Sequence, residues 1–121
     1  MRSLACSVLA AAACGGAVGG TVSGRVSCNI IEAGASAPSS CQEWELVHSG
    51  DSAVYRSACG QLAQPPTETS AFDATGGCDL TSAVGGCQNS GQTPLITTWF
   101  YDPYYTYGAV AAACRDNVVS P

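Results

Sequence analysis

The chain has 121 residues, enough for one domain, and carries nine acidic residues against four arginines and no lysine. Its net charge of −5 argues against nucleic acid and anionic lipid headgroups as partners, because both need clustered positive charge. Eight cysteines in so short a chain indicate an oxidising compartment and a fold held by disulfides. A zinc site is disfavoured, because no Cys-x-x-Cys pair is present.

The N-terminus has the pattern of an export signal. Met1 and Arg2 precede an apolar run from Leu4 to Ala13. This run has the length of a signal-peptide core and is too short to span a bilayer. We therefore predict that residues 1–13 are a signal peptide.

The residues before Cys14 leave two ways of processing open. Ala11 and Ala13 satisfy an ordinary signal peptidase. The same stretch resembles a bacterial lipobox, in which the cysteine is acylated and becomes the mature N-terminus, although Ala11 stands where a lipobox usually has leucine.

The cysteine count favours lipidation. Cys6 leaves with the signal peptide, and acylation of Cys14 leaves six cysteines, an even number. A cut after Gly20 also leaves six, but it puts Val18 at the position where a small residue is needed. The glycine-rich stretch that follows has the composition of a flexible linker. We predict that residues 14–24 are a tether that begins with lipidated Cys14, and that residues 25–121 form a cysteine-rich domain.

The first half of that domain predicts two strands and a helix. Residues 25–32 are short and β-branched, and residues 33–40 have turn composition. Residues 41–48 alternate, with Trp44 and Leu46 on one face. Residues 49–62 carry apolar side chains at helical spacing, with Ser49 or Asp51 as the N-cap.

The second half repeats the pattern after a loop predicted over 63–77, which holds two prolines and two glycines. A weak strand is predicted at 82–88, a hairpin connection at 89–92 and a clear strand at 94–102. Residues 104–117 then predict a helix with Tyr107, Val110, Ala111 and Cys114 on one stripe.

Each half thus runs strand, turn, strand, helix, and each helix carries Tyr and Cys. We read this as a weak internal duplication. It predicts an α+β fold, ββα-ββα, in which a four-stranded antiparallel sheet carries two helices on one face.

Six cysteines allow fifteen pairings. The order of the elements favours Cys28–Cys41 within the first hairpin and Cys59–Cys78 across the long loop. It also favours Cys87–Cys114, which joins the last helix to the sheet.

The chain resembles small cysteine-rich lipoproteins that are abundant in myxobacteria and related bacteria. The matching pieces are Cys41-Gln42-Glu43-Trp44, Ala58-Cys59, Cys78, Gly86-Cys87, Thr97 to Tyr101 and Ala113-Cys114. Two features depart from the pattern: a Gly-Gly pair is displaced to 76–77, and none follows Cys114. No activity is assigned to those relatives, so the resemblance implies an address and a fold.

Catalytic patterns are weak in this sequence. The one histidine, His48, lacks a Gly-x-Ser-x-Gly nucleophile turn and is predicted to lie at the surface. Glu43 and Glu45 share one face of a strand, an arrangement compatible with a glycosidase carboxylate pair, but the alternation predicts that this face is solvated. Asp73 and Asp79 match no calcium loop. We expect no catalytic residues, no metal and no cofactor.

Residues 99–107, WFYDPYYTY, concentrate the aromatic residues of the chain. Strand alternation buries Trp99 or Phe100 and leaves Tyr104 and Tyr105 at a corner, where they form the predicted contact patch. Aromatic faces stack on sugar rings, so cell-wall glycan is one expected partner and an envelope protein another.

Together these patterns predict an exported, lipid-anchored bacterial envelope protein with a structural or binding role and no enzymatic activity. Its partners would be the membrane, through the lipid on Cys14, and a glycan or protein of the envelope, but not nucleic acid. The alternative is a freely secreted cysteine-rich toxin or effector that acts on another cell.

Overall fold

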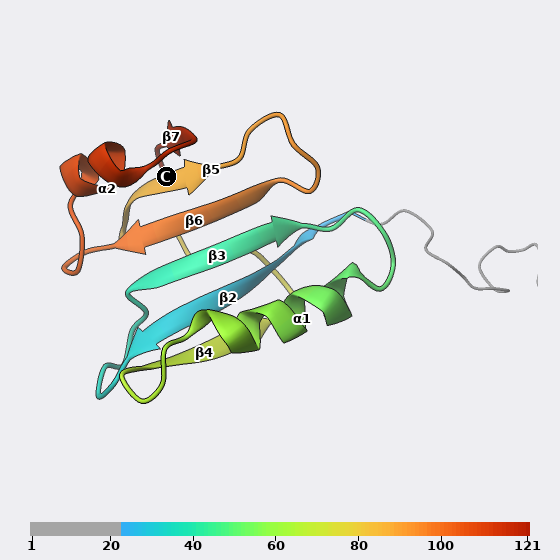
Figure 1. The fold of residues 1–121 in the computed structure, drawn as a ribbon, viewed down its shortest axis with the longest axis horizontal. Helices are drawn as coiled ribbons and strands as arrows, with labels where there is room; N and C mark the ends of the chain where they lie inside the picture. Colours follow the sequence, from blue (N-terminus) through green and yellow to red (C-terminus); the bar gives the residue numbers. More distant parts are fainter. Residues whose placement is uncertain (1–22) are drawn as a thin grey trace, which may run out of the picture.

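The computed structural model describes residues 23–121, so the predicted signal peptide, Cys14 and most of the tether lie outside the described residues. The described part is an α+β domain with two helices and one six-stranded antiparallel sheet (Figure 1). The predicted class is confirmed, and the predicted count of four strands is wrong.

The elements follow one another as two similar series. They are β2 (Arg25–Glu32), β3 (Ser40–Glu45), α1 (Asp51–Leu62), β4 (Glu68–Asp73), β5 (Ala83–Gln88), β6 (Ile96–Tyr101), α2 (Tyr107–Ala113) and β7 (Asn117–Val119). The four predicted strands and both helices are present, although α2 is shorter than predicted. The two additional strands, β4 and β7, each follow a helix and pair at an edge of the sheet.

The strand order β4-β2-β3-β6-β5-β7 shows that each half has the topology ββαβ. In each half the first strand pairs with both the second and the third, and the second strands of the halves pair with each other. The duplication inferred from the sequence is therefore a structural one, with a third strand added to each half.

The register places a pseudo-twofold axis at the pair Gln42 and Thr98. These residues oppose each other on β3 and β6, and each also opposes the cysteine of its own half, Cys28 or Cys87. Pairs equally far from Gln42–Thr98 on either side map onto each other, for example Cys41–Trp99 and Glu43–Thr97. The two halves therefore meet antiparallel at the centre of the sheet.

Both helices lie on the same face of the sheet, which we call the helix face. Directly opposed residues on neighbouring strands share a face, and the register puts Cys28 and Cys87 on one face with Gln42 and Thr98. A disulfide joins each of these cysteines to the end of a helix, Cys28 to Cys59 of α1 and Cys87 to Cys114 after α2. α1 packs on β2 and β4, whereas α2 packs on β5.

The opposite face, which we call the back face, is covered in part by the connection from β4 to β5. This connection passes behind the sheet in Figure 1, and Cys78 within it is bonded to Cys41 of β3. Two cores result. The core under α1 consists of Val26, Cys28, Ile30, Trp44 and Cys59. The core of the back face consists of Cys41, Trp99 and Tyr101.

The register also explains the disulfide pairing. Cys28 opposes Gln42, so Cys41, one position away, points to the other face of the sheet. The predicted bonds Cys28–Cys41 and Cys59–Cys78 are therefore wrong, and Cys87–Cys114 is confirmed. All six cysteines of residues 23–121 are paired.

The helices begin differently. The N-cap of α1 is Gly50, at φ 94°, rather than Ser49 or Asp51, and the Asp51 carboxylate accepts hydrogen bonds from the backbone N–H groups of Val47 and His48. α2 begins after Thr106, whose Oγ1 accepts from the N–H of Ala109 at 3.1 Å.

Candidate functional site

Glu43 and Glu45 do not form an exposed carboxylate pair. Glu43 is 7% exposed, and its carboxylate accepts hydrogen bonds from the backbone N–H of Cys78 at 2.9 Å and from Arg25 Nη1 at 3.3 Å. Only Glu45 is exposed. The prediction that both lie on a solvated face is wrong for Glu43, because the connection from β4 to β5 covers that part of the back face.

His48 lies at the exposed turn before α1, as predicted, with Nδ1 4.0 Å from Asp51 Oδ2. Asp73 and Asp79 close local turns, in which they accept hydrogen bonds from Thr75 and Thr81. These bonds hold the pKa of both carboxyl groups below its ordinary value. Within residues 23–121 no group of three or more His, Cys, Asp or Glu side chains is placed to hold a metal ion.

The aromatic segment is divided between core and surface. Trp99 and Tyr101 are buried on the back face, and Phe100 points to the helix face. Tyr104 and Tyr105, the predicted contact patch, are 44% and 37% exposed. The Tyr105 ring meets the Phe100 ring edge to face at 4.9 Å, so Tyr105 is anchored at one side.

Tyr107 does not lie on a buried stripe of α2, as the sequence had predicted. It is 51% exposed, and its ring lies against the backbone of Gly85, where a Cβ atom would be 3.1 Å from Cδ1. Val110 is the buried residue of this helix. With only seven residues, α2 covers one side of β5 and leaves much of its own surface in solvent.

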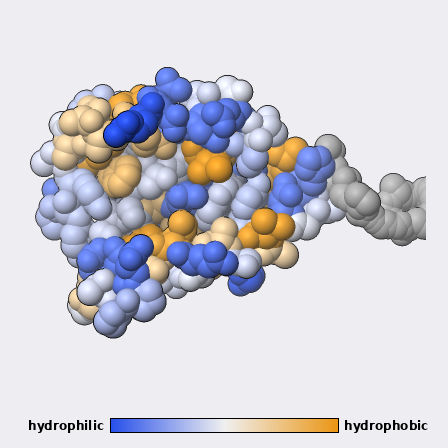
Figure 2. All heavy atoms as spheres, in the orientation of Figure 1, coloured by the Kyte–Doolittle hydropathy of each residue, from blue (hydrophilic) through white to orange (hydrophobic). Residues whose placement is uncertain are grey.

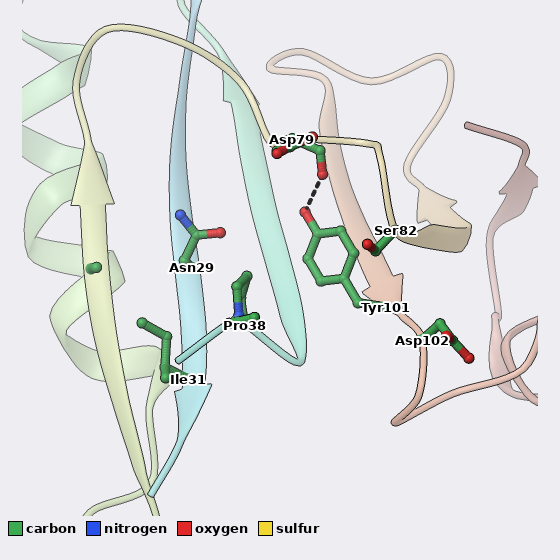
Figure 3. Close-up of a pocket in the computed structure, with 9 residues that line it drawn as sticks. Asn29, Ile31, Pro38, Asp79, Ser82, Tyr101 and Asp102 are labelled. Atoms are coloured by element: carbon green, nitrogen blue, oxygen red, sulfur yellow. Dashed lines mark hydrogen bonds between the residues drawn. The ribbon is translucent and has the colours of Figure 1, made fainter. Parts of the chain in front are cut away.

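A cavity of about 350 Å³ opens on the back face (Figure 3). Asn29 and Ile31 of β2, Pro38 of the first hairpin and Tyr101 of β6 line it, together with Asp79, Ser82 and Asp102. The Tyr101 hydroxyl donates to the backbone carbonyl of Asp79 at 2.7 Å. Burial, with the nearby Asp79 and Glu43 charges, raises the pKa of Tyr101 to about 12, so this hydroxyl stays protonated at neutral pH.

A groove runs over the helix face between α1 and α2, and we call it the central groove. It consists of three adjoining hollows of about 280, 380 and 180 Å³. The first two share Cys87 and Phe100, and the second and third share Thr98. The helices pack mainly on the outer strands, so Gln42 of β3 and Ile96, Thr98 and Phe100 of β6 form the floor of this groove.

The central groove changes character along its length. Under α2 its lining is apolar, with Phe100, Tyr105, Ala109 and Ala113. At the axis Thr98 Oγ1 donates to Gln42 Oε1 at 3.3 Å, which leaves the amide nitrogen of Gln42 outside this bond. Asp116 lines the middle hollow and Glu68 the third. Figure 2 views this face and shows apolar surface near both helices with hydrophilic atoms between them.

Sequence reasoning missed the central groove, although one signal pointed to it. Gln42 lies on the same strand face as Trp44, which the alternation assigns to the core, so an amide side chain stood on a predicted apolar face. Thr98 holds the equivalent position on β6. Polar residues at the centre of an apolar face indicate that the helices leave this part uncovered.

The fold defines a class: a disulfide-linked α+β domain made of two ββαβ halves, with a groove between its helices. In comparisons with known families, curated proteins and solved structures, nothing matches this chain. Among residues 23–121, no helix has both the length and the apolar character needed to cross a bilayer.

Proposed function

We propose that this chain is an exported, non-enzymatic binding protein of a bacterial envelope, held to the membrane through a lipid on Cys14. The observation that carries the proposal is the closed set of disulfides. All six cysteines of residues 23–121 pair with one another, so the folded domain requires no cysteine from the N-terminal segment. Three disulfides also fit an oxidising, extracytoplasmic location.

The binding role rests on the surface of the domain. It offers the back-face cavity and the central groove. The exposed corner at Tyr104 and Tyr105 borders the groove through Tyr105. His48 lines neither hollow, and Glu43 is engaged by Cys78 and Arg25. The expected partners are an envelope protein or a cell-wall glycan, and the negative net charge argues against nucleic acid.

Mass spectrometry of the mature N-terminus, combined with cell fractionation, tests the proposal. We expect a diacylglyceryl mass on Cys14 and the protein in the membrane fraction, because two or more acyl chains hold a protein stably at about 0.8 kcal/mol per buried CH₂. Cys14→Ser should release it, whereas Cys6→Ser, inside the predicted signal peptide, should leave the mature protein unchanged.

Two results would contradict this proposal. An unmodified N-terminus on a protein found in the medium would refute the anchor and favour the alternative, a freely secreted toxin or effector. Membrane association that persists in the Cys14→Ser variant would show that something other than this lipid holds the protein.

A further inference from the structure

We infer that the central groove binds an extended peptide segment of a partner protein, with a large apolar side chain under α2 and a basic side chain near each of Asp116 and Glu68. This deepens the binding role proposed above and names the chemistry of the partner. It does not depend on the lipid at Cys14.

The groove is an open, preformed site. Its floor residues Gln42, Ile96, Thr98 and Phe100 lie in the two central strands of a six-stranded sheet, yet all four are only partly buried. α1 packs over β2 and β4 and reaches Trp44 of β3 through Tyr55, and α2 packs over β5. The part of β3 and β6 around Gln42 and Thr98 stays only partly covered.

The apolar end of the groove favours a side chain over a sugar. Its hollow of about 280 Å³ is lined by Cys87, Phe100, Tyr105, Val110, three further apolar positions of α2 and its end, and only the Tyr105 hydroxyl there offers a polar side-chain group. Sugar hydroxyls placed here would lose water without gaining partners, which is costly. A Leu- or Phe-sized side chain gains from the same burial.

The charges of the groove favour a basic partner. Asp116 and Glu68 line it, and none of its lining residues in the described part is basic. Arg25 is paired with Glu43 on the back face, and Arg56 lies over the Phe72 ring, 4.7 Å from its centroid. Arg115 precedes Asp116 in the chain but does not line the groove. Glu68 Oε1 accepts a hydrogen bond from the backbone N–H of Gln64 at 3.0 Å, which leaves its negative charge in place. An acidic peptide would therefore meet like charge at both positions.

The dimensions fit an extended segment. Glu68 begins β4 and Asp116 directly precedes β7, the two edge strands, which are separated by five strand spacings. The five spacings of about 4.8 Å give roughly 24 Å across the strands. The register adds about six residues, roughly 20 Å, along them, because Glu68 opposes Glu32 whereas Asp116 is level with Ile96, Trp44 and Val26. The separation is therefore roughly 31 Å, which about nine extended residues span. The backbone groups of β3 and β6 are used within the sheet, so the peptide would be held by side chains, including the amide nitrogen of Gln42.

Fluorescence polarisation with the full chain, purified after export, tests the inference. The probes are labelled Gly/Ser peptides of roughly eleven residues with one Leu and with Arg near both ends. Leu is placed near either Arg in turn. Matched probes carry Glu for both Arg, or Ser for Leu. We expect the Arg/Leu probes to bind best and to weaken as salt rises.

Variants on one helix locate the site. Ala113→Trp should fill the apolar hollow and weaken binding about tenfold or more, as loss of a central anchor does. Ala112→Trp, an exposed position of α2 outside the hollow, should bind like the parent. Asp116→Asn and Glu68→Gln should each weaken binding about two- to fivefold, and Asp102→Asn on the back face should not.

The inference is overturned if the Glu probes bind as well as the Arg probes, or if Ala113→Trp binds like Ala112→Trp. It is also overturned if no probe binds below about 1 mM, the weak end of specific recognition, or if an uncharged oligosaccharide or a second copy of the chain occupies the groove instead. Fractionation of the same preparations reports on the Cys14 anchor separately, so the two proposals fail independently.

Discussion

The Glu43 carboxylate accepts a hydrogen bond from the backbone N–H of Cys78 at 2.9 Å, across 35 positions of sequence. This contact and the Cys41–Cys78 disulfide fasten the connection from β4 to β5 to the back face. The carboxylate therefore replaces a backbone partner for a loop that crosses the sheet.

We expect Glu43→Ala to lower the free energy of unfolding by about 1–3 kcal/mol, because it leaves the Cys78 N–H without its acceptor. Glu45→Ala, on the same strand but exposed, should change it by less than about 0.5 kcal/mol. Denaturant unfolding of the oxidised proteins measures both. Equal effects of the two substitutions would contradict a structural role of Glu43.

A side chain at Gly86 is expected to lower the stability of the domain. A Cβ atom there would be 2.8 Å from Cε3 of Trp99 and 3.0 Å from Cγ2 of Val119, both in the packed back-face region. Gly86→Ala should cost about 1–3 kcal/mol through overpacking. Gly76→Ala, where nothing lies within 4 Å of the added atom, is the control and should unfold near the parent midpoint. A Gly86→Ala variant that melts like the control would show that Trp99 is free to shift.

The Tyr101 hydroxyl should ionise at a higher pH than an ordinary tyrosine. Burial raises its pKa from 10.0 to about 12, so its contribution to stability is fully present below pH about 10 and is lost as the pH rises through about 12. Tyrosinate absorbance, followed rapidly after an alkaline pH jump, should show a component near pH 12 in the parent. Tyr101→Phe should lack that component, and its persistence would mean that another tyrosine carries it.

The two tyrosines of the predicted contact patch should differ in stability. Tyr105→Ala loses the edge-to-face contact with Phe100, worth about 0.5–1.5 kcal/mol beyond the area it buries. Tyr104→Ala, at a 44% exposed residue, should stay within about 0.5 kcal/mol of the parent. Thermal melting compares them, and a pull-down on isolated cell wall shows whether either contacts the envelope. Early melting of both variants, with binding like the parent's, would place the whole corner in the core.

Local sequence pattern was sufficient for much of this fold. β-branched residues predicted β2, alternation predicted β3, helical spacing predicted α1, and an aromatic run bounded by prolines predicted β6. These signals depend on residues within a few positions of one another, so they can be recognised without knowledge of the tertiary fold. The even number of cysteines and the repeated order of elements likewise indicated three disulfides and an internal duplication.

Only the tertiary structure decided how these pieces meet. β4 (ETSAFD) lies in a stretch of loop composition and β7 (NVV) has only three residues, so neither stands out in the sequence. They form because β2 and β5 offer free edges for pairing. Cys28 opposes Gln42 rather than Cys41, so two disulfides differ from the predicted ones. The loop that crosses the back face buries Glu43. The central groove depends on where two helices stop covering a sheet. The sequence by itself determined which residues form elements, because that is local. Strand register and helix placement decided which faces are covered, because those arise from contacts between residues far apart in the chain.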